Sequence, residues 1–183
     1  MSDKKVDVIV LGAGIVGVSA AYAAQQQELS VVLVDRREPG SGGYHREFKP
    51  NPARALRRPI HDADGSFLMT PMEQGIRVTS GVELTDHDAP SSYAQIDAVE
   101  PLAREVVEFG EQVGDTWRGA RPTLPDSLPM IGPAPRHAGL WLAFGNQHIG
   151  FTTGPATGAA IAAMIKGTPP SYDVTAFAPS RYI

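Results

Sequence analysis

Aliphatic residues in the first part of the chain fall into two short runs, separated by a stretch rich in glycine and alanine. Residues 6–11 and 30–34 are β-branched and aliphatic, which predicts two strands buried on both faces. Residues 15–27 are rich in alanine and predict a helix that begins at the intervening glycines. Strand, turn, helix and strand together span about 30 residues, the size of a βαβ crossover.

Beyond Asp35 the pattern changes to loops and short strands. Residues 36–43 contain Pro39 and several glycines and are expected to form a loop. Residues 76–80 alternate between apolar and polar side chains, which is typical of an antiparallel sheet with one face in water. The remaining periodicity predicts strands at 56–60, 67–70, 116–121 and 140–144, and helices at 91–109 and 155–165.

Composition narrows the classes of function. The 183 residues carry a formal net charge of −4, which argues against nucleic acid as a partner, because such binding needs a clustered basic face. No cysteine is present, so disulfides, thiolate-bound metals and cysteine nucleophiles are excluded. His87 and His137 have no partner at metal-ligand spacing, so no metal site is expected.

The glycines between the first strand and helix have the spacing of a dinucleotide-binding turn. Gly12 would let the chain leave the strand sharply, Gly14 would let a pyrophosphate approach the backbone, and Gly17 would let the helix lie close to the sheet. The diphosphate would sit on the free N–H groups of the helix start, which includes Ile15 and Val16.

An acidic residue about 20 positions after the glycines completes the fingerprint. Asp35 ends the second predicted strand, where its carboxylate can accept both ribose hydroxyls and would repel the 2′-phosphate of NADP. Arg36 follows and either flanks the adenine or is a solvated loop arginine. The fingerprint alone does not separate FAD from NAD.

Two segments in the second half carry a family resemblance. Residues 119–132, GARPTLPDSLPMIG, and residues 140–158, LWLAFGNQHIGFTTGPATG, resemble conserved stretches of the D-amino acid oxidase and dehydrogenase family. The resemblance is strongest to bacterial D-amino acid dehydrogenase-like proteins, and glycine and sarcosine oxidases are more distant relatives. Gly43, Tyr44 and His45 resemble the start of that family's substrate-domain sheet.

The resemblance implies an α/β fold: an incomplete Rossmann-like FAD-binding domain with an antiparallel substrate-domain sheet. Residues 1–43 and 118–183 would form the discontinuous FAD-binding domain, and residues 44–117 a partial substrate-binding domain. Family members are roughly twice as long, so a large internal deletion is expected between Gly42 or Gly43 and Tyr44. The FAD-domain sheet would then keep open edges and an uncovered apolar face.

The resemblance also implies roles for particular residues. Arg121 matches the arginine that holds the substrate carboxylate, and its planar guanidinium suits that bidentate contact; the alternative is a structural arginine paired with a surface acid. Gly150, Phe151 and Thr152 would precede the last helix and offer N–H groups and a hydroxyl to the flavin. His148 would line the pocket or tune the flavin, or be merely structural. Tyr44 and His45 would form part of the substrate wall, or be ordinary strand residues.

The expected function is FAD-dependent oxidation of D-amino acids or related amines to imino and 2-oxo acids by hydride transfer to the flavin. The alternative is a non-catalytic dinucleotide-binding remnant, or a subunit that completes its fold on a partner chain. Association as a homo-oligomer or with such a completing partner chain is left open. Oxygen or a quinone would accept the electrons. A cytoplasmic location is expected, with peripheral association with the inner membrane face as the alternative.

Overall fold

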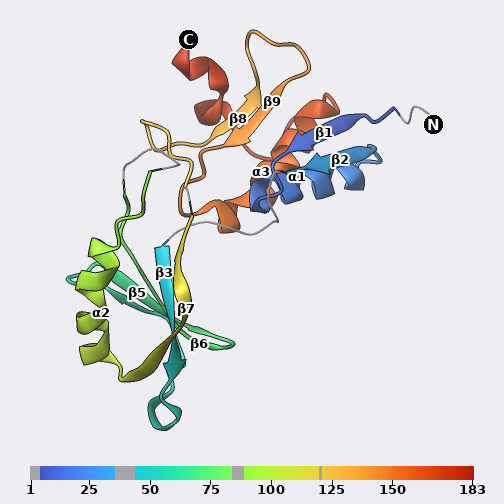
Figure 1. Ribbon diagram of the computed structural model, residues 1–183. Coiled ribbons are helices and arrows are strands. Elements are labelled where there is room, and N and C mark those ends of the chain that lie inside the picture. Colours follow the sequence, from blue (N-terminus) through green and yellow to red (C-terminus); the bar gives the residue numbers. More distant parts are fainter. Residues whose placement is uncertain (1–4, 36–43, 84–88, 120) are drawn as a thin grey trace. The chain divides into compact units, whose positions relative to one another are not determined.

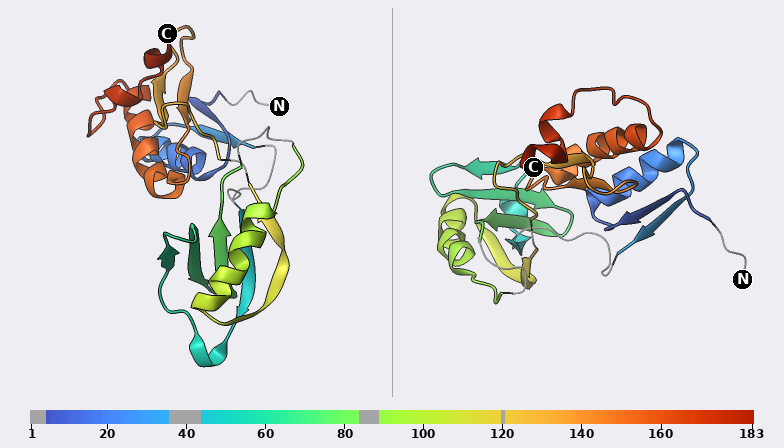
Figure 2. Two further views of the ribbon diagram at one scale, coloured as in Figure 1. Left: turned by 90° about the vertical axis from the view of Figure 1, so that its left-hand side faces the viewer. Right: turned by 90° about the horizontal axis from the view of Figure 1, so that it is seen from above.

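The chain folds into two compact units, and the computed structural model describes residues 5–35, 44–83, 89–119 and 121–183 (Figures 1 and 2). The terminal unit comprises Met1–Gly40 and Arg121–Ile183, and the central unit comprises Ser41–Ala120. In the part of the chain that is described, none of the helices has the length and hydropathy needed to cross a lipid bilayer.

The terminal unit begins with the predicted strand, helix and strand. Strands β1 (Val8–Leu11) and β2 (Val31–Val34) pair in parallel, and α1 (Ile15–Gln26) connects them. Helix α1 packs on one face of this pair and buries its alanines, Ala20, Ala21 and Ala24, against its neighbours. The βαβ prediction is therefore confirmed in the order and type of its elements.

The prediction that both faces of β1 and β2 are buried is wrong. Ile9 is 61% exposed and Leu11 is 80% exposed, and in the parallel register Val32 and Val34 stand beside them on the same face. No described element covers these four side chains, because the described part of the terminal unit places its helices on the other side of the pair (Figure 1). An open apolar face is what the expected deletion implies.

Residues 130–165 contain the remaining strands and α-helix of the described part of the terminal unit. Strands β8 (Met130–Pro133) and β9 (Trp141–Phe144) form an antiparallel pair, and α3 (Gly150–Ile165) lies beside α1 (Figures 1 and 2). Ile131, Ala160 and Ile161 form its apolar core with side chains of β9 and of the turns after α3. The sequence predicted β9 but missed β8, which lies in a stretch dominated by proline.

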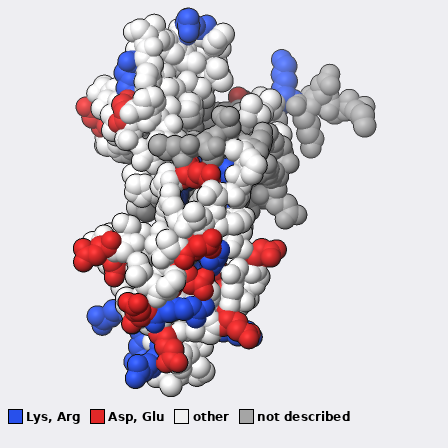
Figure 3. All heavy atoms as spheres, turned by 60° about the vertical axis from the view of Figure 1, so that its left-hand side comes forward, with Lys and Arg blue, Asp and Glu red and all other residues white. Residues whose placement is uncertain are grey.

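The central unit is a five-stranded antiparallel sheet with one helix across one face. The strand order is β4-β5-β6-β3-β7, with β3 Tyr44–Pro50, β4 Ile60–Asp62, β5 Phe67–Met72, β6 Gly75–Ser80 and β7 Phe109–Arg118. Helix α2 (Ala94–Val106) places Ile96, Val99 and Ala103 on the sheet, and these side chains share one core with Phe48, Met69, Ile76 and Val78. On the face drawn in Figure 3, acidic and basic side chains are interspersed over this unit.

Three elements predicted in the central unit differ from the structure in their bounds. Residues 56–59 are not a strand, because Pro59 and the arginines before it lead into β4 as a loop while Leu56 packs against the core. The helix ends at Val106, and Phe109 reaches the core from the start of β7 instead. Strand β7 therefore begins seven residues before the predicted Thr116.

Candidate functional site

The three glycines of the turn meet three different spatial requirements. Gly12 has a φ of +105°, a conformation that L side chains rarely adopt. A Cβ on Gly14 would have no heavy atom within 4 Å, so open space lies above the backbone there. A Cβ on Gly17 would lie 1.8 Å from the carbonyl oxygen of Gly12, so only glycine lets α1 fold back onto the turn.

Asp35 is tied to the middle of the turn. Its Oδ2 accepts a hydrogen bond from the backbone N–H of Ala13 at 2.5 Å, and the backbone N–H of Gly12 donates to the carbonyl of Val34 at 2.7 Å. A hollow beside the turn is lined by Leu11, Gly12, Val34 and Asp35. The end of β2 therefore shapes the turn directly. Arg36, expected beside the adenine, lies outside the described residues.

The start of α1 is free for an anion. Its N-cap is Gly14, no side chain caps it, and its first turn contains no acidic residue. The first N–H groups of a helix have no acceptor within the helix, and the helix dipole gives this end a partial positive charge. Ile15 and Val16 stand at this end, next to the open space above Gly14.

Helix α3 packs on α1 through small residues and in the same direction. A Cβ on Gly154 would lie 3.2 Å from Cγ1 of Ile15, and a Cβ on Gly158 would lie 2.5 Å from the backbone carbon of Ser19. Successive positions on one helix thus meet successive positions on the other, so the two N-termini lie at the same end. Gly150, Gly154 and Gly158 recur every fourth residue, a one-face helical pattern that was available in the sequence.

Gly150, Phe151 and Thr152 form the first turn of α3, rather than preceding the helix as predicted. The helix starts five residues before the predicted Pro155, which it accommodates within its second turn. The N–H of Thr152 donates to the carbonyl of Ile149 at 3.0 Å, so it is not available to a ligand in this conformation. Ile149 is the N-cap and offers no side-chain acceptor, and Phe151 is 80% exposed.

Arg121 and His148 both lie in the terminal unit. Arg121 is half-buried, and within the described part of the chain its guanidinium has neither a hydrogen bond nor an ion pair. The alternative of a structural arginine paired with an acid therefore gains no support from the described residues. His148 is exposed and makes no polar side-chain contact with the described residues.

Tyr44 and His45 point to opposite faces of β3, so they cannot both line one wall. The Tyr44 ring is buried on the α2 side, and its hydroxyl donates a hydrogen bond to Oε2 of Glu83. Burial, followed by this contact, raises the pKa of Tyr44. A small cavity of about 80 Å³ adjoins the ring and is lined by Tyr44, Ser80, Glu83, Ser92, Gln95 and Ile96.

His45 lies on the face opposite α2. Its ring stacks on Trp117 at a centroid distance of 4.8 Å, and burial, followed by the charge of Arg77, lowers its pKa. Glu47 on the same strand pairs with Arg77 at 2.6 Å. This face is therefore polar, in contrast to the apolar face under α2.

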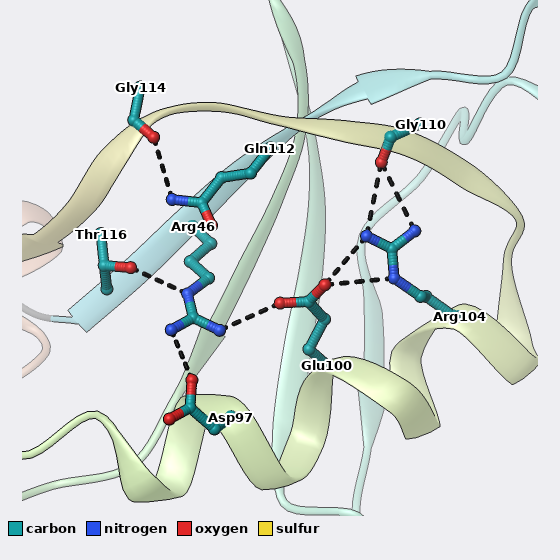
Figure 4. A network of polar contacts seen from close by, with 8 residues as sticks. All are labelled: Arg46, Asp97, Glu100, Arg104, Gly110, Gln112, Gly114 and Thr116. Carbon is teal, nitrogen blue, oxygen red and sulfur yellow. Dashed lines mark hydrogen bonds and ion pairs between the residues drawn. The ribbon is translucent and has the colours of Figure 1, made fainter.

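Arg46 fixes α2 on the sheet (Figure 4). Its guanidinium donates to Oγ1 of Thr116 at 2.8 Å, to Oδ1 of Asp97 at 2.5 Å and to Oε2 of Glu100 at 3.0 Å. Arg104 shares Glu100 and lies 4.4 Å above the ring of Phe109. The charged groups of this network are paired with one another, so the network stabilises the packing of α2 on the sheet of the central unit.

The chain belongs to the FAD dependent oxidoreductase family: the sequence model of that family matches residues 7–50 and 41–164. The two matched segments overlap at residues 41–50. The resemblance inferred from residues 119–158 is thereby confirmed.

Curated relatives agree with this family. The chain is 25% identical over 195 residues to a D-amino-acid oxidase of Bradyrhizobium diazoefficiens, covering 100% of the chain and 45% of the relative. It is 32% identical over 122 residues to a glycine oxidase of Pseudomonas putida, covering 64% of the chain and 33% of the relative. A D-amino acid dehydrogenase 2 of Mesorhizobium japonicum is 31% identical over 118 residues, covering 62% of the chain and 28% of the relative. The chain thus spans less than half the length of these relatives.

Solved structures share the fold. Glycine oxidase from Geobacillus kaustophilus matches 76% of the chain and 38% of its own length, with a TM-score of 0.65 and 20% identity. Iminodiacetate oxidase from Chelativorans sp. BNC1 matches 96% of the chain and 47% of its own length, with a TM-score of 0.63 and 22% identity. The fold is therefore an incomplete Rossmann-like α/β domain with an antiparallel sheet domain.

Proposed function

We propose that this chain binds FAD and forms the frame of an oxidoreductase for D-amino acids or related amines. The observation that carries the proposal is the pair of uncapped helix N-termini, α1 and α3, which lie at the same end of the terminal unit beside the glycine turn. Residues 1–43 and 118–183 would form the FAD-binding domain, and residues 44–117 the substrate side.

The residues present fit the ADP half of FAD. The open space above Gly14 leaves room for a pyrophosphate, which would accept hydrogen bonds from the N–H groups of Ile15, Val16 and Gly17. Asp35, at the end of β2, would accept the ribose hydroxyls. Its hydrogen bond to Ala13 holds the turn in shape for this contact.

The start of α3 fits the flavin end. The N–H groups of Gly150 and Phe151 stand at the positive end of the helix, where they would donate to the pyrimidine carbonyl of the ring. This positive end would favour the negative charge that grows there on reduction. When bound, the flavin supplies the redox chemistry by taking a hydride from the substrate Cα.

Arg121 would hold the substrate. Its guanidinium has no partner among the described residues, and its two parallel N–H groups suit bidentate capture of an α-carboxylate. Loss of the Cα hydride from a neutral amine leaves an imino acid, which water converts to a 2-oxo acid and ammonia. The protein's part is to orient the substrate. Tyr44 and His148 complete the set of proposed site residues.

The proposal is tested by purifying the chain and recording visible flavin absorbance, followed by anaerobic addition of a panel of D-amino acids, glycine and sarcosine. Bound flavin that is bleached by members of the panel is the expected result. A protein that stays colourless after incubation with FAD, or a flavin that no compound bleaches, contradicts the enzymatic part. Hydrogen peroxide formation on admission of air would distinguish oxygen from a quinone as the acceptor.

The open face of β1 and β2 favours the second candidate, a frame completed by another chain. Ile9, Leu11, Val32 and Val34 are between 41% and 80% exposed, and such contiguous apolar surfaces in proteins commonly mark interaction sites. Sedimentation of the wild type and of the Leu11→Lys variant tests this candidate. A wild type that is monomeric and fully soluble without a partner would contradict it.

A further inference from the structure

Asn146 lies just ahead of α3 and makes polar contacts into the helix. It is 5% exposed, and its Nδ2 donates to Oγ1 of Thr153 at 2.9 Å and to Oγ1 of Thr157 at 3.2 Å. Its backbone carbonyl accepts the N–H of Ile149 at 3.1 Å. The side chain therefore contacts the helix at two successive turns.

Thr153 determines which way the amide of Asn146 faces. The Thr153 hydroxyl donates its proton to the carbonyl of Ile149 at 3.0 Å, so its oxygen can only accept from Asn146. The NH₂ group must therefore face the helix and Oδ1 must face away. Oδ1 is buried and has no hydrogen-bond partner among the described residues, an uncommon and unfavourable state. The amide nitrogen thus donates to both threonine hydroxyls, while the amide oxygen is left without a donor among the described residues.

This arrangement leaves the helix N-terminus uncapped. Asparagine is among the strongest N-cap residues because its oxygen accepts helix N–H groups. Here Ile149 holds the N-cap position, and no side-chain oxygen accepts from the first turn. Gly150 lies against Asn146, where its added Cβ would be 3.4 Å from the Cβ of Asn146.

The segment around Asn146 also joins α3 to the segment that carries Arg121. Gly145 and Gln147 have positive φ values of +87° and +50°, and the N–H of Gln147 donates to the carbonyl of Pro122 at 3.3 Å. A Cβ on Gly145 would lie 2.8 Å from Cδ1 of Leu124. Asn146 is thus held between the proposed substrate arginine and the proposed flavin-binding end of α3.

We infer that Asn146 is a positioning residue for the flavin, because it holds the first turns of α3 through Thr153 and Thr157 while leaving the N–H groups of Gly150 and Phe151 open. This inference rests on the proposed FAD site. In this inference the positive end of α3 is positioned by a buried amide, and not by a group that touches the cofactor.

The test compares Asn146→Ala, Asn146→Asp and Thr157→Val with the wild type. The aspartate variant is nearly isosteric with the wild type, yet its carboxylate cannot donate to either threonine and adds a negative charge at the helix start. We expect Asn146→Asp to weaken FAD binding about tenfold, the effect of a charge at a helix terminus in its upper range, and to make the flavin reduction potential more negative. Asn146→Ala should weaken binding with a smaller change of potential, and Thr157→Val should have the mildest effect.

The readouts are the FAD dissociation constant from fluorescence quenching, the midpoint potential, and the thermal midpoint of the chain without FAD. Asn51→Ala is the matched control, since Asn51 caps a short 3₁₀ turn in the central unit by accepting from Ala53 at 2.9 Å. Variants that lose thermal stability but keep the wild-type dissociation constant and potential overturn the inference alone. A wild type that binds no FAD overturns the proposed function as well, which separates the two failures.

Discussion

Oδ2 of Asp35 lies 2.5 Å from the backbone nitrogen of Ala13, so the end of β2 holds the centre of the glycine turn. The contact joins positions 22 residues apart in sequence. The fingerprint predicts Asp35 as a ribose ligand. In the structure its carboxylate also holds the glycine turn through Ala13, a contact that does not depend on a bound ligand. A charged acceptor makes a stronger hydrogen bond to an N–H group than a neutral one does.

Replacing Asp35 separates these two tasks. Asp35→Ala leaves the N–H of Ala13 without its acceptor and removes the ribose contact, so FAD affinity should fall about tenfold to a hundredfold. Asp35→Asn keeps an oxygen that can accept from the N–H of Ala13, so its FAD affinity should fall less than that of Asp35→Ala. Titration with FAD measures both constants, and equal losses in the two variants would show that holding the turn contributes nothing.

Gly14 and Gly17 should respond differently to the same substitution. Gly14→Ala adds a methyl group to open space at ordinary φ and ψ, so the fold should tolerate it while the pyrophosphate loses its approach. Gly17→Ala places a methyl group against the carbonyl of Gly12 and should destabilise the terminal unit by about 2 kcal/mol or more. Thermal denaturation without FAD, together with FAD titration, checks the contrast.

The α1–α3 contact offers a second matched pair. Gly158→Ala would press a methyl group into the backbone of Ser19 and should cost about 1–3 kcal/mol of unfolding free energy. Gly154→Ala meets the flexible side chain of Ile15 at 3.2 Å, and alanine gains about 1 kcal/mol in helix propensity over glycine. Gly154→Ala should therefore be close to neutral. Urea denaturation compares them, and a larger loss for Gly154→Ala would contradict the packing described.

Arg121 can be tested apart from the fold. If the chain oxidises an amino acid, Arg121→Met should raise KM about thirtyfold through loss of a charge-assisted contact of about 2 kcal/mol, with FAD affinity unchanged. Arg136→Met, in the exposed turn between β8 and β9, is the matched control. An unchanged KM in Arg121→Met would remove Arg121 from the substrate site.

Asp126 makes the C-terminal turns sensitive to acid. Its carboxylate accepts from Nε of Arg181 at 2.7 Å, and this hydrogen bond holds the pKa of Asp126 well below its usual range. A carboxyl group whose pKa is lowered by folding stabilises the native state above the unfolded pKa, about 4, and loses that contribution as the pH falls through the folded pKa.

Asp126→Asn should therefore lower the thermal midpoint at neutral pH and flatten its dependence on pH below about pH 4. Melting curves between pH 2 and 7 give the measurement, compared with those of Asp173→Asn in the C-terminal turns that carry Arg181. A wild type whose stability stays constant over this interval would rule out the contribution of the Asp126–Arg181 pair.

The sequence predicted the βαβ unit well because its signals are local. Gly12 needs its positive φ and Gly17 its closeness to the turn, and both requirements follow from a spacing visible in the chain. The start of α3 was less predictable, since Pro155 marks a helix start in local statistics but is tolerated here within the first turns of a longer helix. Tertiary packing of Gly150 and Gly154 on Ile15 overrides that local signal.

Contacts between residues far apart in the chain were not predicted from the sequence. Nothing near Asp35 indicates that it accepts from Ala13, and nothing near Asn146 indicates that its amide reaches two threonines along α3. The assignment of Tyr44 and His45 to one wall ignored the period of two along a strand, which sends neighbours to opposite faces. The uncovered side of β1 and β2 was predictable, because it followed from the expected deletion.

The closeness of Gly158 to Ser19 also sets an order of folding. The two residues are about 140 positions apart, so α1 leaves the ribosome long before the helix that covers it exists. The central unit, which is continuous in sequence, can assemble during that interval. The glycine turn is therefore synthesised long before the helix that packs on α1, and until then this segment depends on staying soluble without its covering helix.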